Sequence, residues 1–270
     1  MIIPSDKIAT IVQARMSSSR LPFKVMMSLA GKPLLHRMIE RVNSSILKGS
    51  VIVATSTESS DDPIDSFCKK EGIRCFRGSL NDLLERHLQA AEEVTAEYVL
   101  KIPSDVPLID PDVINRVVSY FFKNIDKFDY VSNLHPATYP DGNDVEIMTI
   151  DVLRKANEMA KVTMEREHTT PWIWENPDVN RIGNVVWETG LDYSMTHRWT
   201  IDYEEDYLFI KKIYDELYSP LKHFSMYDIL SLLERNPKIA AINNKYAGVN
   251  WYRNHLKELK TVTANQTKVI

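Results

Sequence analysis

The sequence predicts an α/β protein built on a doubly wound, mostly parallel, Rossmann-like sheet. Short apolar runs alternate with segments of helical periodicity through the first half of the chain. The apolar runs are continuous, which is typical of strands that are buried on both faces. The helical segments between them are amphipathic and therefore suited to cover the two faces of a parallel sheet. With 270 residues, 44% of them hydrophobic, the chain is long enough to bury a substantial core.

The first half of the chain supplies four expected strands and four expected helices. The strands are the runs "IATIVQA", "VIVATS", "IRCFRG" and "YVLKI". A helix opens after Gly31-Lys32-Pro33, and its apolar residues fall on one face. The next begins at Asp61-Asp62-Pro63, a third is capped by Ser79 and runs through Ala91, and a fourth runs from Asp110-Pro111 to Phe122.

The second half of the chain has a different rhythm. From about 134 to 197 it is rich in Pro, Trp, Tyr and turn residues, so we expect an inserted lobe or dimerisation arm there. The run "RWTID" is expected to be a further strand that ends at Asp202, followed by an amphipathic helix in "EEDYLFIKKIYDEL". We therefore expect one domain over residues 1–243 and a polar tail over 244–270, in which the stretch "TVTANQTK" (261–268) frays.

Charge and composition exclude several classes of function. A net charge of −4 and a pI near 6.0 argue against a general nucleic-acid or membrane-surface binder, because both need a broad positive field. No apolar run approaches the ~20 residues of a membrane span. The first residues, "MIIPSDK", do not resemble a secretory signal, and there are only two cysteines. We therefore expect a cytoplasmic protein with reduced thiols.

A local concentration of positive charge lies in the turn "QARMSSSRLPFK", directly after the first expected strand. Arg15, Arg20 and Lys24 have no nearby acid in the sequence, and three serines lie between the arginines. Such a turn is suited to a small anionic ligand, because its hydroxyls, backbone N–H groups and cations all stabilise negative charge. The spacing of a Walker A loop is absent.

Two aspartates are candidates for a metal site. Asp105 follows the expected fourth strand, and Asp202 ends the further strand expected in "RWTID". Ligands of doubly wound sheets bind beyond the carboxyl ends of strands, so the basic turn and these aspartates are expected to share one edge. Mg²⁺ needs only a few protein carboxylates there. Asp110 and Asp112 form a D-x-D pattern, but helix capping explains it better.

Several motifs together resemble a known family. The stretches "QARMSSSRLPFK", "GKPLL", "SDVPLIDP", "DGNDVE", "REHTTPW" and "RWTIDYEEDY" are similar to those of cytidylyltransferases that activate acidic sugars, particularly the branch of spore-coat polysaccharide synthesis protein F. The wider group includes the synthetases of CMP-3-deoxy-manno-octulosonate and CMP-acylneuraminate. The resemblance covers about residues 9 to 218. It implies a sheet of the nucleotide-diphospho-sugar transferase type in a single nucleotidyltransferase domain.

The resemblance also implies a reaction and the residues that perform it. The reaction is Mg²⁺-dependent transfer of the cytidylyl group of CTP to the hydroxyl of an acidic, 2-keto sugar, which gives a CMP-sugar and pyrophosphate for surface polysaccharide or glycan synthesis. The residues implied for catalysis are Arg15, Lys24, Asp105 and Asp202, and the two aspartates are also the implied metal ligands. The residues implied for nucleotide binding are Ala14, Arg15, Ser17, Ser18, Ser19, Arg20, Lys24, Arg86 and Ser104. The residues implied for sugar binding are Asp144, Glu146, Arg166 and His168.

The chain departs from the pattern of this branch at three positions. Ser17 and Phe23 stand where glycine is usual, and Asn143 stands where leucine is usual. Glycine allows a backbone to approach phosphate closely and to adopt positive φ, so the turn is expected to be stiffer or differently shaped.

Several alternatives stay open. Arg86 is either close to the nucleotide or paired with Asp82 on a helix surface, and His168 is either a sugar ligand or a core histidine. A glycosyltransferase that uses a nucleotide sugar and a non-catalytic nucleotide-binding subunit are the alternative functions. Trp172, Trp174 and Trp187 in the expected lobe predict a homodimer, because large aromatic residues outside a main core often mark an interface.

Overall fold

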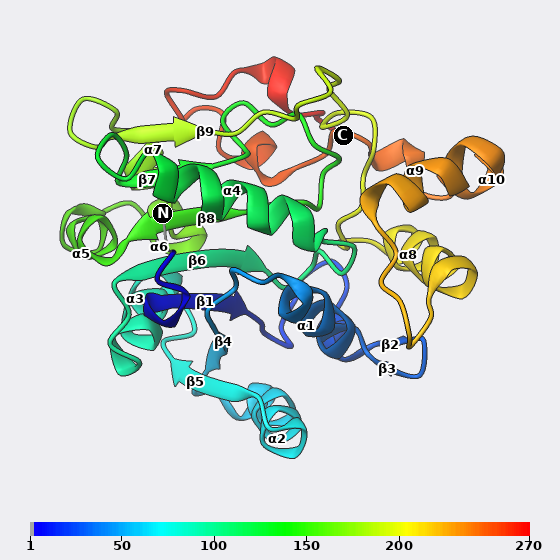
Figure 1. Ribbon diagram of the computed structural model, residues 1–270, viewed down its shortest axis with the longest axis horizontal. Helices are drawn as coiled ribbons and strands as arrows, with labels where there is room; N and C mark the ends of the chain where they lie inside the picture. Colours follow the sequence, from blue (N-terminus) through cyan, green and yellow to red (C-terminus); the bar gives the residue numbers. More distant parts are fainter. Residues whose placement is uncertain (1–2) are drawn as a thin grey trace.

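A computed structural model describes residues 3–270, and it contains one central sheet of seven strands (Figure 1). The order across the sheet is β5-β4-β1-β6-β8-β7-β9. The strands are β1 (Ile8–Gln13), β4 (Ser50–Ser56), β5 (Arg74–Gly78), β6 (Tyr98–Pro103), β7 (Tyr130–Ser132), β8 (Glu146–Thr149) and β9 (Ile182–Asn184). A separate small hairpin consists of β2 (Ser28–Leu29) and β3 (Lys32–Pro33).

The sheet is mostly parallel, as the sequence predicts. β1 pairs in parallel with both β4 and β6, and β4 pairs in parallel with β5. β8 runs antiparallel to both β6 and β7, while β9 is parallel to β7. After β1, the chain forms β4 and β5 on one side of β1, and it then crosses back to form β6 on the opposite side of β1. The switch in strand order therefore lies between β1 and β6, and the carboxyl ends of these two strands are the expected ligand edge.

Helices cover both faces of the sheet (Figure 1). Successive residues of β1 alternate between two apolar cores: Ile8 and Val12 belong to one, Ala9 and Ile11 to the other. The first core packs under α1 (Leu34–Ser44), α2 (Asp62–Glu71), α4 (Pro111–Lys123), α8 (Glu204–Leu217), α9 (Met226–Arg235) and α10 (Pro237–Ala240). The second packs under α3 (Leu83–Glu93), α5 (Ile150–Met159), α6 (Thr163–His168) and α7 (Pro171–Trp174). The doubly wound fold is therefore confirmed.

Two helix starts differ in detail from the prediction. Asp82, not Ser79, is the N-cap of α3, and its carboxylate accepts the backbone N–H of Glu85. Asp61 precedes α2, but its carboxylate does not cap that helix. It turns back and accepts the backbone N–H of Met16 at 2.8 Å and that of Ser56 at 3.2 Å. The buried Asp61 therefore ties the loop after β1 to the end of β4.

The expectation of a lobe set apart from the sheet over residues 134–197 is wrong. This stretch contributes β8 and β9 to the central sheet itself. Trp172, Trp174 and Trp187 are buried in the cores of this chain. The three tryptophans therefore pack within one protomer, and their number is no sign of an interface. The turn-rich composition reflects the short strands and the many connections of this half of the sheet.

Two further expectations on the second half of the chain are wrong. Residues 199–202 are not a strand; Arg198 forms only an isolated bridge with Asp141. The tail beyond residue 243 folds back over the molecule, where it is drawn in orange to red (Figure 1). Tyr252, Leu259 and Val262 are buried in the second core. No helix among residues 3–270 is long and apolar enough to cross a bilayer.

Replacing Asp61 by alanine should lower the free energy of unfolding by about 3 kcal/mol, because the backbone N–H groups of Met16 and Ser56 lose a buried acceptor. Asp62→Ala is the matched control: Asp62 makes an exposed ion pair with Arg77, and its loss should cost about 1 kcal/mol or less. Urea unfolding of both variants measures the difference. Equal losses would contradict the anchoring role of Asp61.

Candidate active site

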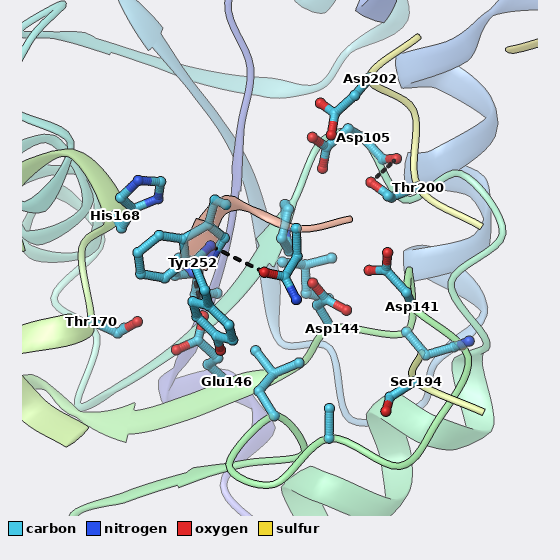
Figure 2. A pocket seen from close by; sticks show the side chains of 18 of the residues that line it. Asp105, Asp141, Asp144, Glu146, His168, Thr170, Ser194, Thr200, Asp202 and Tyr252 are labelled. Carbon is cyan, nitrogen blue, oxygen red and sulfur yellow. Dashed lines mark hydrogen bonds and ion pairs between the residues drawn. The ribbon is translucent and has the colours of Figure 1, made fainter. Parts of the chain in front are cut away.

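A cavity of 640 Å³ opens at the carboxyl ends of β1 and β6. Its walls come from the loop after β1, the loop after β6, the segment between β7 and β8, the turn after α6 and the C-terminal tail. The elements were separate in the sequence, and the switch in strand order brings them together. In Figure 2, Asp105 and Asp202 lie at one end of this cavity, and His168 and Tyr252 lie on another side with Glu146 beside Tyr252.

The loop after β1 provides the basic wall. Arg15, Arg20 and Lys24 line the cavity, as do the hydroxyl residues Ser18 and Ser19. These five positions, which the sequence analysis connects with the nucleotide, therefore lie in one cavity. Of the other positions implied for the nucleotide, Ser104 also lines the cavity, whereas Ala14 is buried behind the loop and Ser17 faces outward.

One of the two departures from glycine in this loop has a conformational consequence. Phe23 has a φ of 63°, in the left-handed region that favours glycine, and its side chain is 60% exposed. Its backbone N–H donates to the carbonyl of Met16 at 2.9 Å and closes the loop. Ser17 is not among the residues with positive φ. The loop therefore keeps a glycine-like conformation at Phe23 and needs none at Ser17.

Asp105 and Asp202 converge on the ammonium of Lys24. Lys24 Nζ lies 3.0 Å from Asp105 Oδ2 and 3.2 Å from Asp202 Oδ1. In Figure 2 the two carboxylates lie together at one end of the cavity. Burial would lower the pKa of Lys24, but the two carboxylates outweigh it and raise the pKa. Burial would likewise raise the pKa of Asp202, but Lys24, Arg20 and Arg198 lower it to about 2.

The segment before Asp202 is fastened directly to the loop that carries Asp105. The backbone N–H of Ile201 donates to the carbonyl of Asp105 at 2.9 Å, and the Thr200 hydroxyl donates to the same oxygen at 3.2 Å (Figure 2). Asp202 therefore reaches the strand edge as part of an irregular segment, although it ends no strand.

Arg198 is the charged group that sequence reasoning missed. Its guanidinium makes two bonds to Asp206, at 2.9 and 3.0 Å, and one to Asp202 at 3.0 Å. It also lies 3.5 Å from Asp141 and donates to the carbonyl of Val249. The side chain is almost completely buried, and although burial lowers its pKa, the carboxylates raise it further. The sequence carries one signal of this cluster, because Arg198, Asp202 and Asp206 follow one another at regular intervals of four residues.

Asp141, Asp144 and Glu146 form an acidic wall on another side of the cavity (Figure 2). Burial and the charge of Asp105 raise the pKa of Asp144 to about 6, and burial raises that of Asp141 as well. Glu146 behaves differently: burial would raise its pKa, but an ion pair with Lys101 and hydrogen bonds from Thr170 and Tyr130 lower it. Asp144 and Glu146, which the resemblance implies for the sugar, thus both line the cavity.

Gly142 allows the acidic wall to lie close to the segment that carries Arg198. It has a φ of 113°, and a Cβ atom there would lie 2.8 Å from the backbone of Trp199. Next to Gly142, the backbone N–H of Trp199 donates to the backbone carbonyl of Asp141 at 2.6 Å. Only glycine fits this approach without a backbone shift.

His168 lies in the cavity wall, and its ring stacks on Trp251 with a centroid distance of 3.8 Å and an angle of 14°. Burial and the nearby cations Lys101 and Arg15 lower its pKa to about 3. The imidazole is therefore neutral near pH 7. His168 is one of the residues implied for the sugar, whereas Trp251 lies in the polar tail, which the sequence analysis did not connect with the site.

Neither Arg166 nor Arg86 lines the cavity, although the resemblance implies Arg166 for the sugar and Arg86 for the nucleotide. Arg166 does not line the cavity, because its guanidinium bonds to Asp82, with Nε at 2.8 Å, and to Asn157. The implied contact between Arg166 and the sugar is therefore not supported. Arg86 is fully buried and donates to the carbonyl of Ser79, so a surface pair with Asp82 is wrong. Among the described residues its Nε and Nη2 have no partner, and burial together with Arg15 lowers its pKa to about 10.

The residues present fit a divalent cation at Asp105 and Asp202. Both carboxylates already point at one cation, the Lys24 ammonium, at hydrogen-bond distance. No group of three or more metal-ligating side chains occurs among residues 3–270. A site with two carboxylates suits Mg²⁺, which takes its other oxygen ligands from phosphate and water.

The D-x-D pattern has a structural role. Asp110 is buried, and its carboxylate accepts the backbone N–H of Asp112 at the start of α4 and that of Met226 at the start of α9. Neither Asp110 nor Asp112 lines the cavity. Helix capping therefore explains this motif, as the sequence analysis expects.

Known proteins resemble this chain over most of its length. A sequence model of a family described as cytidylyltransferase matches residues 9–234. The spore coat polysaccharide biosynthesis protein SpsF of Bacillus subtilis is 29% identical over 240 residues, which cover 87% of this chain and 97% of that protein. The 3-deoxy-manno-octulosonate cytidylyltransferase of Chloroherpeton thalassium is 31% identical over 118 residues, 44% of this chain and 47% of that protein.

A solved structure shares the fold. The structure of a cytidylyltransferase from Leptospira borgpetersenii superposes with a TM-score of 0.81 at 32% identity, and it covers 87% of this chain and 96% of that one.

The neutral imidazole of His168 predicts a pH dependence of stability. Its pKa is about 3 in the folded chain and about 6.5 when unfolded, so between these values the unfolded chain binds the extra proton and acid favours unfolding. The contribution of His168 to the free energy of unfolding should fall by about 2 kcal/mol from pH 7 to pH 5. In urea unfolding, His168→Gln should lose correspondingly less stability over this range than the unmodified protein. Parallel curves for the two proteins would contradict a neutral buried imidazole.

Proposed function

The chain belongs to the cytidylyltransferase family, and we propose that it transfers the cytidylyl group of CTP to a sugar hydroxyl with release of pyrophosphate. One observation carries this proposal most strongly. Asp105 and Asp202 meet at Lys24, the last cation of the basic loop, at the switch point of the sheet. A phosphate-binding loop and a pair of carboxylates at one place are what nucleotidyl transfer needs.

Residues of the loop after β1 hold and orient the triphosphate in this proposal. Arg15, Arg20 and Lys24 line the cavity and balance the charge that grows on the leaving pyrophosphate. Ser18, Ser19 and Ser104 offer hydroxyl donors at the same edge. Ala14, Ser17 and Arg86, which the resemblance also implies for the nucleotide, do not line the cavity. The sugar oxygen bonds to the α-phosphorus, and the bond from that phosphorus to pyrophosphate breaks.

Asp105 and Asp202 would hold Mg²⁺. When bound, this ion supplies a Lewis acid that neutralises phosphate charge and lowers the pKa of an attached hydroxyl. The need for a cation follows from the lining itself, in which carboxylates outnumber the cationic side chains. An anionic nucleotide would otherwise meet a cavity that is negative on balance.

We propose an acidic 2-keto sugar as the acceptor and a CMP-sugar for surface polysaccharide synthesis as the product. The names of two relatives support this: one is a 3-deoxy-manno-octulosonate cytidylyltransferase and the other a spore coat polysaccharide biosynthesis protein. In this chain, Lys101 is the cavity cation that lies near both His168 and Glu146, on the sugar side of the site. It replaces Arg166 as the candidate partner of a sugar carboxylate.

The two alternative functions have less support. A glycosyltransferase with a D-x-D metal site would need that motif in the cavity, and Asp110 instead caps α4. A non-catalytic nucleotide-binding subunit has no need of the pair formed by Asp105 and Asp202. The homodimer and the cytoplasmic location stay predictions.

Pyrophosphate release tests the proposed reaction. The purified protein with Mg²⁺ is given each of the four nucleoside triphosphates with a panel of 2-keto sugar acids and sugar phosphates. We expect release with CTP and a 2-keto sugar acid. No release above the acceptor-free rate with any combination would overturn the proposal, and release only with a sugar phosphate would replace the acceptor class.

Asp105→Asn should lower kcat at least about 100-fold while the melting temperature stays close to that of the unmodified protein, because a charged ligand is lost without a change of shape. Asp112→Asn is the matched control, since Asp112 lies outside the cavity, and it should keep full activity. Mg²⁺ titrations of pyrophosphate release with both variants measure the effect. Near-normal turnover in Asp105→Asn would remove Asp105 from the site.

A further inference from the structure

The C-terminal segment 249–266 forms a wall of the cavity, although it lies beyond residue 234, where the match to the family ends. Only its last part, within residues 261–268, was expected to fray, and eight of its side chains or backbone groups face the cavity. These residues are Val249, Asn250, Trp251, Tyr252, Asn254, His255, Asn265 and Gln266.

This wall is built into the molecule by specific bonds. The carboxylate of Glu175 accepts the backbone N–H groups of Lys260 and Thr261, at 2.5 and 2.9 Å. Arg198 donates to the carbonyl of Val249, and Asn250 donates to the carbonyl of Gln266 at 2.8 Å. The segment is therefore tied to α7, to the guanidinium beside Asp202 and to itself.

Apolar packing fixes the same segment. Tyr252, Leu259 and Val262 are buried in the core that also contains Trp172 and Trp174. Trp251 packs with a tilted ring against Trp174, at a centroid distance of 6.3 Å. The ring stacked on His168 therefore has a fixed orientation.

The chemistry of the wall differs from that of the basic loop. Among the described residues, the segment places no lysine, arginine, aspartate or glutamate in the lining. It offers the indole of Trp251, the phenol of Tyr252, the imidazole of His255 and four side-chain amides. An aromatic face packs against the C–H groups of a sugar ring, and amides donate to and accept from its hydroxyls.

The position of the wall also favours a sugar over phosphate. Tyr252 lies beside Glu146 and His168, at the other side of the cavity from Asp105 and Asp202 (Figure 2). The charges of Glu146, Asp144 and Asp141 all act on Tyr252. Carboxylates repel phosphate but accept hydrogen bonds from hydroxyls.

We propose that the segment 249–266 binds the acceptor sugar, with Trp251 as the platform for the sugar ring and the amides of Asn254 and Asn265 as partners of its hydroxyls. This inference rests on the proposed function, which identifies the bound molecule as a sugar. It extends the proposed function by assigning recognition of the acceptor sugar to residues outside the family match. CTP binds at the other end, against the basic loop.

The test compares Trp251→Ala and Trp251→Phe with the unmodified protein. Saturation-transfer NMR measures binding of 3-deoxy-manno-octulosonate and N-acetylneuraminate, and pyrophosphate release measures KM for the sugar and for CTP. Trp251→Ala should raise the Kd and KM of the sugar at least about tenfold and leave the KM of CTP within about twofold, and Trp251→Phe should restore most of the affinity. Leu153→Ala is the matched control: it removes a buried side chain of the same core that lies in α5, outside the segment, and does not line the cavity. It should lower the melting temperature without changing the affinity for the sugar.

The outcomes separate this inference from the proposed function. Unchanged sugar affinity in Trp251→Ala, a selective loss of CTP affinity, or no binding of either sugar to the unmodified protein would each overturn the inference. Sugar binding that depends on Trp251, without pyrophosphate release from any nucleotide, would support the sugar wall and refute cytidylyl transfer.

Discussion

The buried guanidinium of Arg198 is the interaction on which the geometry of the site depends. It holds Asp202 beside Asp105, anchors Asp206 in the first turn of α8, contacts Asp141 in the acidic wall and binds the carbonyl of Val249 in the tail. Carboxylates that share a buried cavity repel one another unless cations lie between them. Removing one partner of such a buried network leaves uncompensated charge, which is strongly destabilising. One side chain thus couples the candidate metal site, a helix and the tail.

The cavity has two chemically different ends because they come from different parts of the fold. The basic end is made by the loop after β1, at the switch point that every doubly wound sheet possesses. The other end is made by the acidic wall of Asp141, Asp144 and Glu146 and by the tail. In the proposed reaction the acceptor sugar binds at this second end, so the acceptor and the nucleotide are recognised by different parts of the fold. The nucleotide end stays fixed by the sheet.

The parts of this structure that depend on local pattern were predictable from the sequence. The buried residues Leu34, Leu35, Met38, Ile39 and Val42 of α1 follow helical periodicity, and the cavity positions Arg15, Arg20 and Lys24 follow from a basic turn after a strand. The partner of Arg166 is Asp82, far along the chain, and no local pattern indicates it.

The tail was missed for a related reason. Its buried residues Tyr252, Leu259 and Val262 follow neither a helical nor a strand period, so their burial depends on long-range contacts alone. The segment around Asp202 was misread because an apolar run between two turns looks the same whether it joins a sheet or only packs on it.

Phe23 shows that this loop needs a left-handed backbone conformation at position 23 even where the residue is not glycine. A non-glycine residue in the left-handed region costs about 1–2 kcal/mol and persists only where its surroundings over-determine the conformation. Here the N–H of Phe23 is bonded to Met16, and the N–H of Met16 is in turn held by the buried Asp61. The very next residue is Lys24, which must turn inward to reach both aspartates. The left-handed turn at position 23 is therefore required by the position of Lys24, and a phenylalanine that adopts it preserves the lysine's contacts at the expense of backbone strain.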